Sequence, residues 1–259
     1  MNPIAVGLIV FAFILGGLLF GVFIRSVLPE GHLGDESKFV MKLGIGLIAT
    51  MTALVLGLVT ASAKSSFDTH DQAVKNAAID ILTLDRILAR YGPETKEIRS
   101  SFRQIVAARH DAIWPPWTSG TFPPARPNNI DPFEATAAIE GVADQIGALK
   151  PQNDAQRSLQ TRAKNTIEEL MKARWMVVGT GNISIPVPFL VAIVFWLVVI
   201  FAIFGMFAPR NATVLTVIFL CALSVSIAVF LIIEMDGPFD GIIKISDTPI
   251  RYVLSHMGQ

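Results

Sequence analysis

Four long stretches without a single charged residue constrain this chain more than any other feature. They are residues 1–24, 43–63, 175–209 and 211–233. A helix of about 20 apolar residues is long enough to cross the hydrocarbon core of a bilayer. Hydrophobic residues make up 52% of the 259 positions and charged residues only 16%, which is too apolar for an ordinary soluble domain. The sequence therefore predicts an all-α integral membrane protein with four transmembrane helices.

The connections between these stretches predict two hairpins. Residues 25–42 form a short polar loop between the first two spans, and only Pro209 and Arg210 separate the last two. We therefore expect a first transmembrane hairpin (1–63), a soluble helical domain (64–174), a second hairpin (175–233) and an amphipathic C-terminal tail (234–259). Four crossings place both termini and the soluble domain on one side of the membrane. A modest excess of Lys and Arg near the span ends predicts that this side is the cytoplasm.

The soluble domain has the periodicity of helices. An apolar stripe from Val74 to Tyr91 predicts a helix that runs unbroken from the second span, until Gly92 and Pro93 end it. A second helix is predicted to follow, and then a proline-rich loop over residues 114–132. Helices are predicted again over 133–149 and 154–176, the latter running into the third span. The tail is expected to lie on the membrane surface or to clasp a neighbouring subunit.

Several functional classes are excluded or disfavoured by composition. The formal net charge is zero and no Lys/Arg run is present, so nucleic-acid binding is not expected. Cys221 is the only cysteine, which excludes an intrachain disulfide and a thiolate metal cluster. The four histidines have no ligand spacing and are expected on solvated helix faces, even where His110 is followed by Asp111. We expect no enzyme and no organic cofactor.

Small and hydroxyl-bearing residues draw one stripe along the second span. The stripe consists of Gly46, Thr50, Ala53, Gly57, Thr60 and Lys64. It has two interpretations. It could line a pore, where hydroxyl groups replace part of an ion's hydration and Lys64 favours anions at one mouth. It could equally be a seam at which helices approach closely, because small residues drive packing in lipid.

Two further groups of residues suggest helix contacts or a metal site. Narrow faces predict helix contacts in the first and fourth spans. Their residues are Gly17, Gly21, Cys221, Ser224 and Ala228. After the fourth span, three carboxylates surround a Gly-Pro turn and suggest a hard cation such as calcium, although the spacing is no calcium-loop signature. They are Glu234, Asp236 and Asp240.

No ionisable residue lies inside a predicted span. Coupled transporters usually need such residues for ions or protons, so a passive pore is favoured. Four helices of one chain scarcely enclose a water path, and the leading hypothesis is therefore a homo-oligomeric ion channel. The alternative is a membrane-anchored scaffold or sensor whose helical domain binds a cytoplasmic partner.

Runs in both halves of the chain carry a family resemblance. They are "PFLVAIVFWLVVIFAIFGMFAPRNATV" and "CALSVSIAVFLIIEMDGPFDGIIKIS" in the second half, and "LGLVTASAKSSFD", "LDRILARYGPE" and "IWP" in the first. With these runs the chain resembles the bestrophin-like family of bacterial membrane proteins, a domain of unknown function. The resemblance implies two hairpins around a helical domain in the bacterial inner membrane. Because bestrophins proper are pentameric anion channels, it also implies a pentamer in contact with lipid and inorganic ions.

Overall fold

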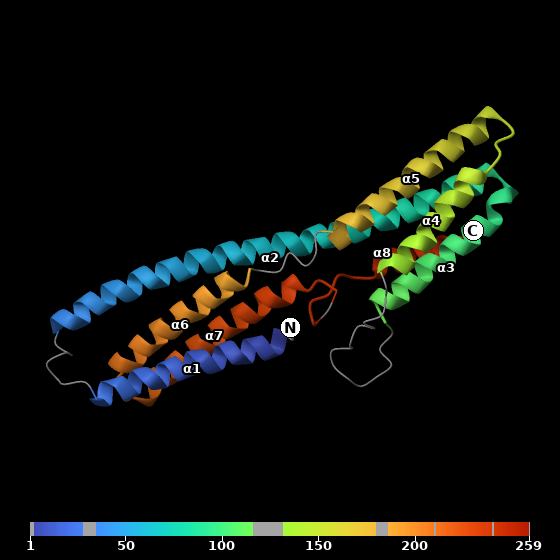
Figure 1. Cartoon of the computed structure of the whole chain (residues 1–259). Coiled ribbons are helices and arrows are strands. Elements are labelled where there is room, and N and C mark those ends of the chain that lie inside the picture. The colour runs from blue at the N-terminus through green and yellow to red at the C-terminus, as the bar shows by residue number, and fades with distance from the viewer. Residues whose placement is uncertain are drawn as a thin grey trace. The chain divides into compact units, whose positions relative to one another are not determined.

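The computed structural model describes residues 3–27, 35–115, 132–179, 186–209, 211–239 and 241–258. Over these residues the chain is helical and forms no strand. The elements are α1 (Pro3–Val27), α2 (Asp35–Tyr91), the 3-10 helix η2 (Pro93–Thr95), α3 (Lys96–Ile113), α4 (Pro132–Ala148), α5 (Asp154–Gly179), α6 (Val187–Phe207), α7 (Ala212–Asp236) and α8 (Thr248–His256) (Figure 1). Four of them are long and apolar enough to cross a membrane, namely α1, α2, α6 and α7. The predicted all-α membrane protein with four spans is confirmed.

The chain divides into two compact units. The first comprises residues 1–67 and 183–237, and the second comprises residues 68–182 and 238–259. In the first unit α1 packs along α6 and α7. Its core contains Ile14 of α1, Ile193 of α6 and Val229 of α7, each at most 1% exposed. Apolar side chains on the remaining faces of these helices are exposed, as expected of surfaces that meet lipid.

Glycines allow the backbones of α1 and α6 to pack so closely that no side chain fits between them. A Cβ atom added at Gly17 would lie 2.7 Å from the carbonyl oxygen of Val198. At Gly21 it would collide with the carbonyl of Ala202, and at Gly205 with that of Leu18. Only glycine fits these three positions, because any side chain would force the helices apart.

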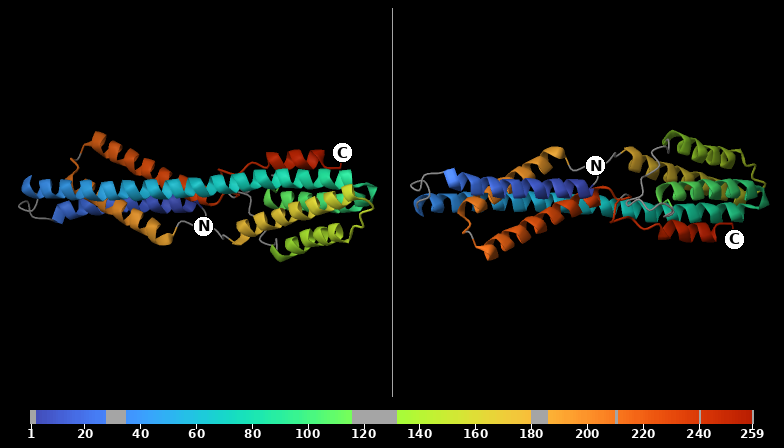
Figure 2. Two further views of the ribbon diagram at one scale, coloured as in Figure 1. Left: turned by 90° about the horizontal axis from the view of Figure 1, so that it is seen from above. Right: turned by 90° about the horizontal axis from the view of Figure 1, so that it is seen from below.

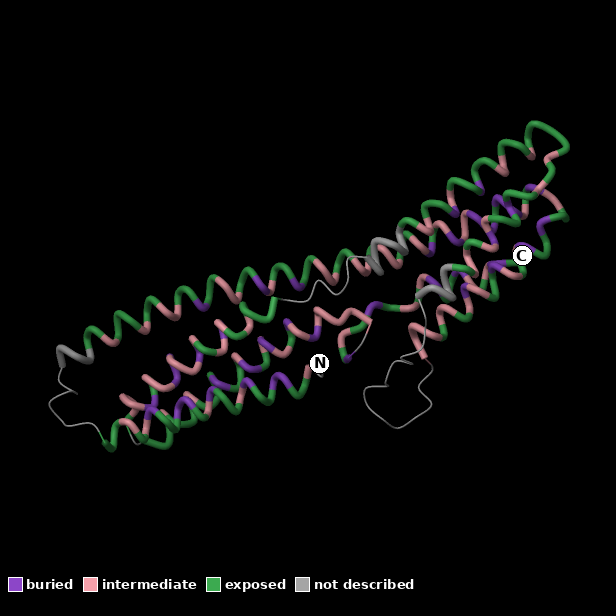
Figure 3. The backbone as a smooth tube through the Cα atoms, viewed as in Figure 1, coloured by how far each residue is buried: buried purple, intermediate pink, exposed green. Residues whose placement is uncertain are grey.

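The N-terminal half of α2 is the least buried of the four spans. Only 6% of its most apolar window is buried, compared with 22 to 28% in the other three spans. Its buried residues in this half are Thr52, Val59 and Ala63. Figure 3 shows this half of α2 mostly in the colour of exposed residues. One side of the helix therefore belongs to the core of the first unit, and the rest of its surface is uncovered within the chain.

The second unit is a helical bundle around the C-terminal half of α2. Views from above and below show α3, α4, α5 and α8 running alongside this half of the helix (Figure 2). Leu84 of α2, Phe102 of α3 and Ile146 of α4 are almost completely buried, and α5 and α8 add Ile167 and Val253 to the same core. The apolar stripe recognised in the sequence is thus the buried face of α2 in this unit.

A glycine and a buried threonine terminate α2. Gly92 has φ 144°, a conformation that favours glycine. The Thr95 hydroxyl, fully buried, donates to the carbonyl oxygens of Leu88 at 2.6 Å and Gly92 at 2.9 Å. The single hydroxyl proton is shared between these two carbonyl groups, and Gly92 also accepts from the backbone N–H of Thr95 at 3.3 Å. The chain can therefore reverse into η2 and α3 inside the core.

Two expectations are confirmed or corrected by the helix boundaries. The unbroken helix from the second span to Tyr91 is confirmed as α2. The continuation of the helix at 154–176 into the third span is wrong, because Pro186 has an extended backbone (ψ 120°) and α6 begins only at Val187. The proline ring removes a backbone donor and restricts the residues before it. The prediction of a proline-rich loop over 114–132 falls mostly outside the described residues.

The expectation for the C-terminal tail is also corrected. Ile250 and Val253 of α8 are buried in the core of the second unit, and so is Met257. The apolar face that we assigned to the membrane surface or to a neighbouring subunit therefore packs against the chain's own helices. Hydrophobic periodicity shows that a face is buried but does not identify what buries it.

Candidate functional site

The small-residue stripe of α2 lies on the uncovered side of this helix. Its residues are exposed except for Thr60, which is half-buried, and they comprise Gly46, Thr50, Ala53, Gly57, Thr60 and Lys64. A Cβ atom added at Gly46 or Gly57 would meet nothing within 4 Å. The side of α2 that contacts the rest of the chain, marked by Thr52, lies roughly 120° around the helix from the stripe. A packing seam along the stripe would therefore need a second molecule.

The threonine hydroxyls of the stripe donate hydrogen bonds within their own helix. Thr50 Oγ1 donates to the carbonyl oxygen of Gly46 at 2.8 Å, and Thr60 Oγ1 donates to that of Leu56 at 2.7 Å. In this arrangement each hydroxyl presents its oxygen lone pairs, and not its proton, to the space beside the helix. The two threonines of the stripe therefore offer acceptors rather than donors.

Lys64 supplies the positive charge at one end of the stripe. Its side chain is exposed, and its ammonium group lies 5.8 Å from the centre of the Phe67 ring, one turn further along α2. This distance permits a cation–π attraction. Because the hydroxyls above it act as acceptors, any attraction of the stripe for anions depends on Lys64.

The predicted helix-contact residues divide into two groups. Gly17 and Gly21 lie at the close approach of α1 to α6. On α7, by contrast, Cys221 and Ser224 are exposed and Ala228 is half-buried, and the face that packs against the chain's own core contains Ala222 and Ser226. A contact through Cys221 and Ser224 would have to be made with another molecule, and it stays a prediction.

The structure does not test the metal site predicted after the fourth span, because only two of its three carboxylates are among the described residues. Glu234 is 2% exposed near the end of α7, and Asp236 is the last residue of that helix. Two positions on a helix are about 200° apart, so these side chains point in different directions. Asp240 lies outside the described residues. Among the residues that are described, no group of three His, Cys, Asp or Glu side chains could hold a metal ion, and the calcium site stays a prediction.

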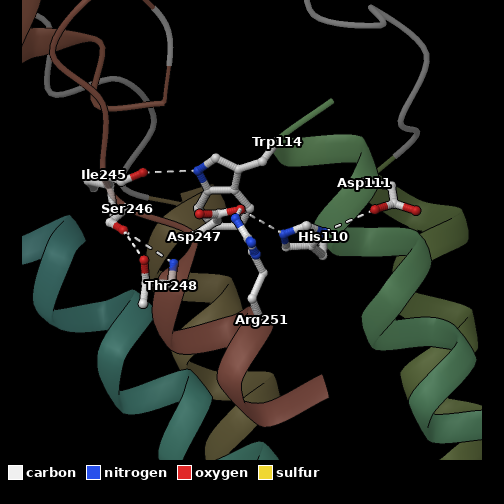
Figure 4. A network of polar contacts seen from close by, with 8 residues as sticks. All are labelled: His110, Asp111, Trp114, Ile245, Ser246, Asp247, Thr248 and Arg251. Carbon is white, nitrogen blue, oxygen red and sulfur yellow. Dashed lines mark hydrogen bonds and ion pairs between the residues drawn. The ribbon is translucent and has the colours of Figure 1, made fainter. Parts of the chain in front are cut away.

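A polar cluster in the second unit was not recognised from the sequence. His110 of α3 lies between two carboxylates, with Nδ1 3.0 Å from Asp111 Oδ1 and Nε2 3.2 Å from Asp247 Oδ2 (Figure 4). The expectation that His110 lies on a solvated helix face is wrong, because its side chain is only 14% exposed. The Cα–Cβ bonds of His110 and Asp111 diverge, but rotation about their side-chain torsions brings the two groups together. The second carboxylate, Asp247, comes from the C-terminal tail.

Comparison with known proteins agrees with this architecture. Four membrane-spanning helices and a helical bundle built on the extension of the second span define the class of protein as a polytopic helical membrane protein. A family model for the Bestrophin-like domain matches residues 11–250. The chain therefore belongs to the bestrophin-like family.

Three crystal structures of variants of a bacterial bestrophin homolog from Klebsiella pneumoniae are similar in fold. Their TM-scores are 0.60, 0.60 and 0.62 at sequence identities of 14 to 16%. The similarity covers 95% of this chain and 98 to 99% of those chains. The sequence matches no curated protein. The family and the fold agree with the resemblance seen in the sequence runs.

Proposed function

We propose that several copies of this chain assemble into an ion-conducting pore whose wall is the stripe of α2. The observation that carries this proposal is the exposure of a stripe of small and hydroxyl-bearing residues, ending at Lys64, on a span that its own chain leaves largely uncovered. The hydroxyl oxygens of Thr50 and Thr60 keep lone pairs that water or a partly hydrated ion can use. Membership of the bestrophin-like family supports a channel rather than an enzyme.

Assembly follows from the same surface. In the part of α2 that belongs to the first unit, one side packs on the chain's own helices and the stripe lies on another. A ring of copies would place every stripe at the symmetry axis, whereas one copy encloses nothing. Resemblance to pentameric bestrophins favours five subunits. We place the pore in the bacterial inner membrane, with the second unit in the cytoplasm.

The first test measures how the hydroxyl group of Thr50 affects conductance. Purified protein reconstituted into planar bilayers should give discrete unitary currents, and Thr50→Val should lower the conductance because it keeps the shape and removes the hydroxyl. Thr52→Val is the matched control, since Thr52 donates to the carbonyl of Ile48 at 2.7 Å in the same way but is only 5% exposed. It should conduct like the unmodified protein. Equal conductance in all three proteins would show that the stripe is not the wall.

The second test measures the charge of Lys64. Repeated around a ring, Lys64 raises the anion concentration at one mouth, and this effect weakens as the Debye length falls from about 10 Å at 0.1 M salt to about 3 Å at 1 M. Lys64→Glu should therefore reverse or reduce any anion preference at low salt and have less effect at high salt. Lys150→Glu, an exposed lysine outside α2, makes the same charge change and should leave selectivity unchanged.

The alternative function predicts a different result in the same apparatus. If the unmodified protein gives no unitary current over a range of voltage and calcium concentration, the chain is better explained as a membrane-anchored scaffold. The stripe would then serve assembly only, and Gly57→Leu would disturb the oligomer without any effect on conduction.

A further inference from the structure

Three contacts attach the C-terminal tail to α3 and to Trp114, the residue that follows this helix. Besides the contact of His110 with Asp247, the Trp114 Nε1 group donates to the carbonyl oxygen of Ile245 at 3.0 Å. The Trp114 ring also packs edge-on against Phe239, with ring centres 6.0 Å apart. Both polar contacts join residues more than 130 positions apart. They determine where the segment that follows α7 lies against the helical bundle.

His110 is satisfied on both sides only when it carries two protons. An ionised carboxylate accepts hydrogen bonds and cannot donate, and neutral imidazole has one N–H group. Nδ1 faces Asp111 and Nε2 faces Asp247, so the neutral ring would leave a nitrogen lone pair against a carboxylate oxygen. The Trp114 ring stacks on the imidazole at 5.7 Å between centres, and an aromatic face also favours a cation.

Asp247 is oriented toward His110 at the expense of its own helix. It occupies the N-cap position of α8, where aspartate usually accepts a hydrogen bond from the first turn, but its side chain makes no such bond. The Ser246 hydroxyl instead accepts from the backbone N–H of Thr248 at 3.2 Å. Arg251 Nη1 lies 3.5 Å from the same Asp247 oxygen that faces His110. Figure 4 shows the side chains of His110 and Arg251 both close to Asp247.

We infer that His110, Asp111 and Asp247 form a proton-dependent latch that holds the C-terminal tail on α3. Protonation of His110 completes both carboxylate contacts, and loss of that proton removes one of the two cations facing Asp247. The contact of Arg251 with Asp247 and the bond from Trp114 to Ile245 remain, so the tail loosens without detaching. Histidine is the side chain whose charge ordinarily changes between about pH 5 and pH 8. The latch is therefore closed when His110 carries two protons and loosened when it carries one.

Hydrogen exchange of the tail in the full-length protein in detergent tests the latch independently of conduction. The relevant amides include Ile245, which donates to Pro238, and Met257, which donates to Val253. After correction for intrinsic exchange, their protection should fall about tenfold between about pH 6 and about pH 8, the effect of losing one charge-assisted hydrogen bond. Equal protection of residues 241–258 at the two pH values would overturn the inference.

Two variants and a control assign the effect to the latch. His110→Gln should remove the pH dependence, and Asp247→Asn, a milder change, should at least halve it if the first variant folds poorly. His256→Gln is the matched control, because His256 lies on α8 and its Nδ1 contacts only the carbonyl of Tyr252 and the hydroxyl of Ser255 among the contacts described. This control should keep the full pH dependence. Loss of the dependence in His256→Gln, or its persistence in both latch variants, would show that another group titrates.

Discussion

At the scale of single residues, a buried ion pair joins α2 to α3. Asp85 is completely buried and accepts two hydrogen bonds from Arg99, at 2.8 Å to Nε and 3.0 Å to Nη2. The hydrogen bond with Asp85 raises the pKa of Arg99 further above its ordinary value. A carboxylate without water needs such a partner, because its desolvation is otherwise uncompensated. The pair therefore constrains how α3 lies on α2.

Removal of Arg99 should destabilise the second unit by leaving the Asp85 charge buried and unpaired. We expect Arg99→Met to cost about 3 kcal/mol, seen as a lower thermal unfolding midpoint of the full-length protein in detergent. Arg103→Met is the control, since Arg103 is exposed on the same helix, and it should change stability by less than about 0.5 kcal/mol. The double variant Asp85→Leu with Arg99→Met should lose less than Arg99→Met alone. An unchanged midpoint in Arg99→Met would contradict this role.

At the scale of elements, the contact between α1 and α6 depends on glycine. Gly16 and Gly21 both lie on α1, yet a Cβ atom has open space at Gly16 and collides with the backbone of Ala202 at Gly21. Gly21→Ala should therefore separate the helices and cost about 1 to 3 kcal/mol. Gly16→Ala should be neutral or slightly stabilising, because alanine favours a helix more than glycine. The thermal unfolding midpoints of the two variants are compared in detergent. A similar loss of stability at both positions would mean that helix propensity, and not the contact with α6, determines the effect.

At the scale of the whole molecule, the predicted two-hairpin topology can be measured by labelling. Cys221 is exposed and should first be replaced by serine. Single cysteines at Ser37 and Asn211 should then react with an impermeant reagent from one side of the membrane, and a cysteine at Ser119 from the other. This follows because each hairpin returns the chain to the side from which it entered. Reaction of Ser119 and Ser37 from the same side would disprove two hairpins.

The number and class of elements could be read from the sequence because they depend on local properties. An uncharged run of sufficient length must be a helix in lipid, where every backbone group needs a partner within the chain. The 3.6-residue period likewise indicated the long helix through Val74 to Tyr91, and Gly92 indicated its end. Family membership was also visible, since ordered runs of residues carry it.

Only the tertiary structure decided what each helix face contacts. The periodicity of α2 showed a stripe of small residues but not whether the chain itself covers it, and the structure leaves Gly46 and Gly57 open. The apolar face of the tail could have met lipid, a neighbouring subunit or its own bundle, and it packs in the bundle. His110 and Asp247 are 137 positions apart, and no spacing rule connects them. Side chains distant in sequence meet only when the helices pack, and packing depends on the whole set of buried surfaces rather than on any one segment.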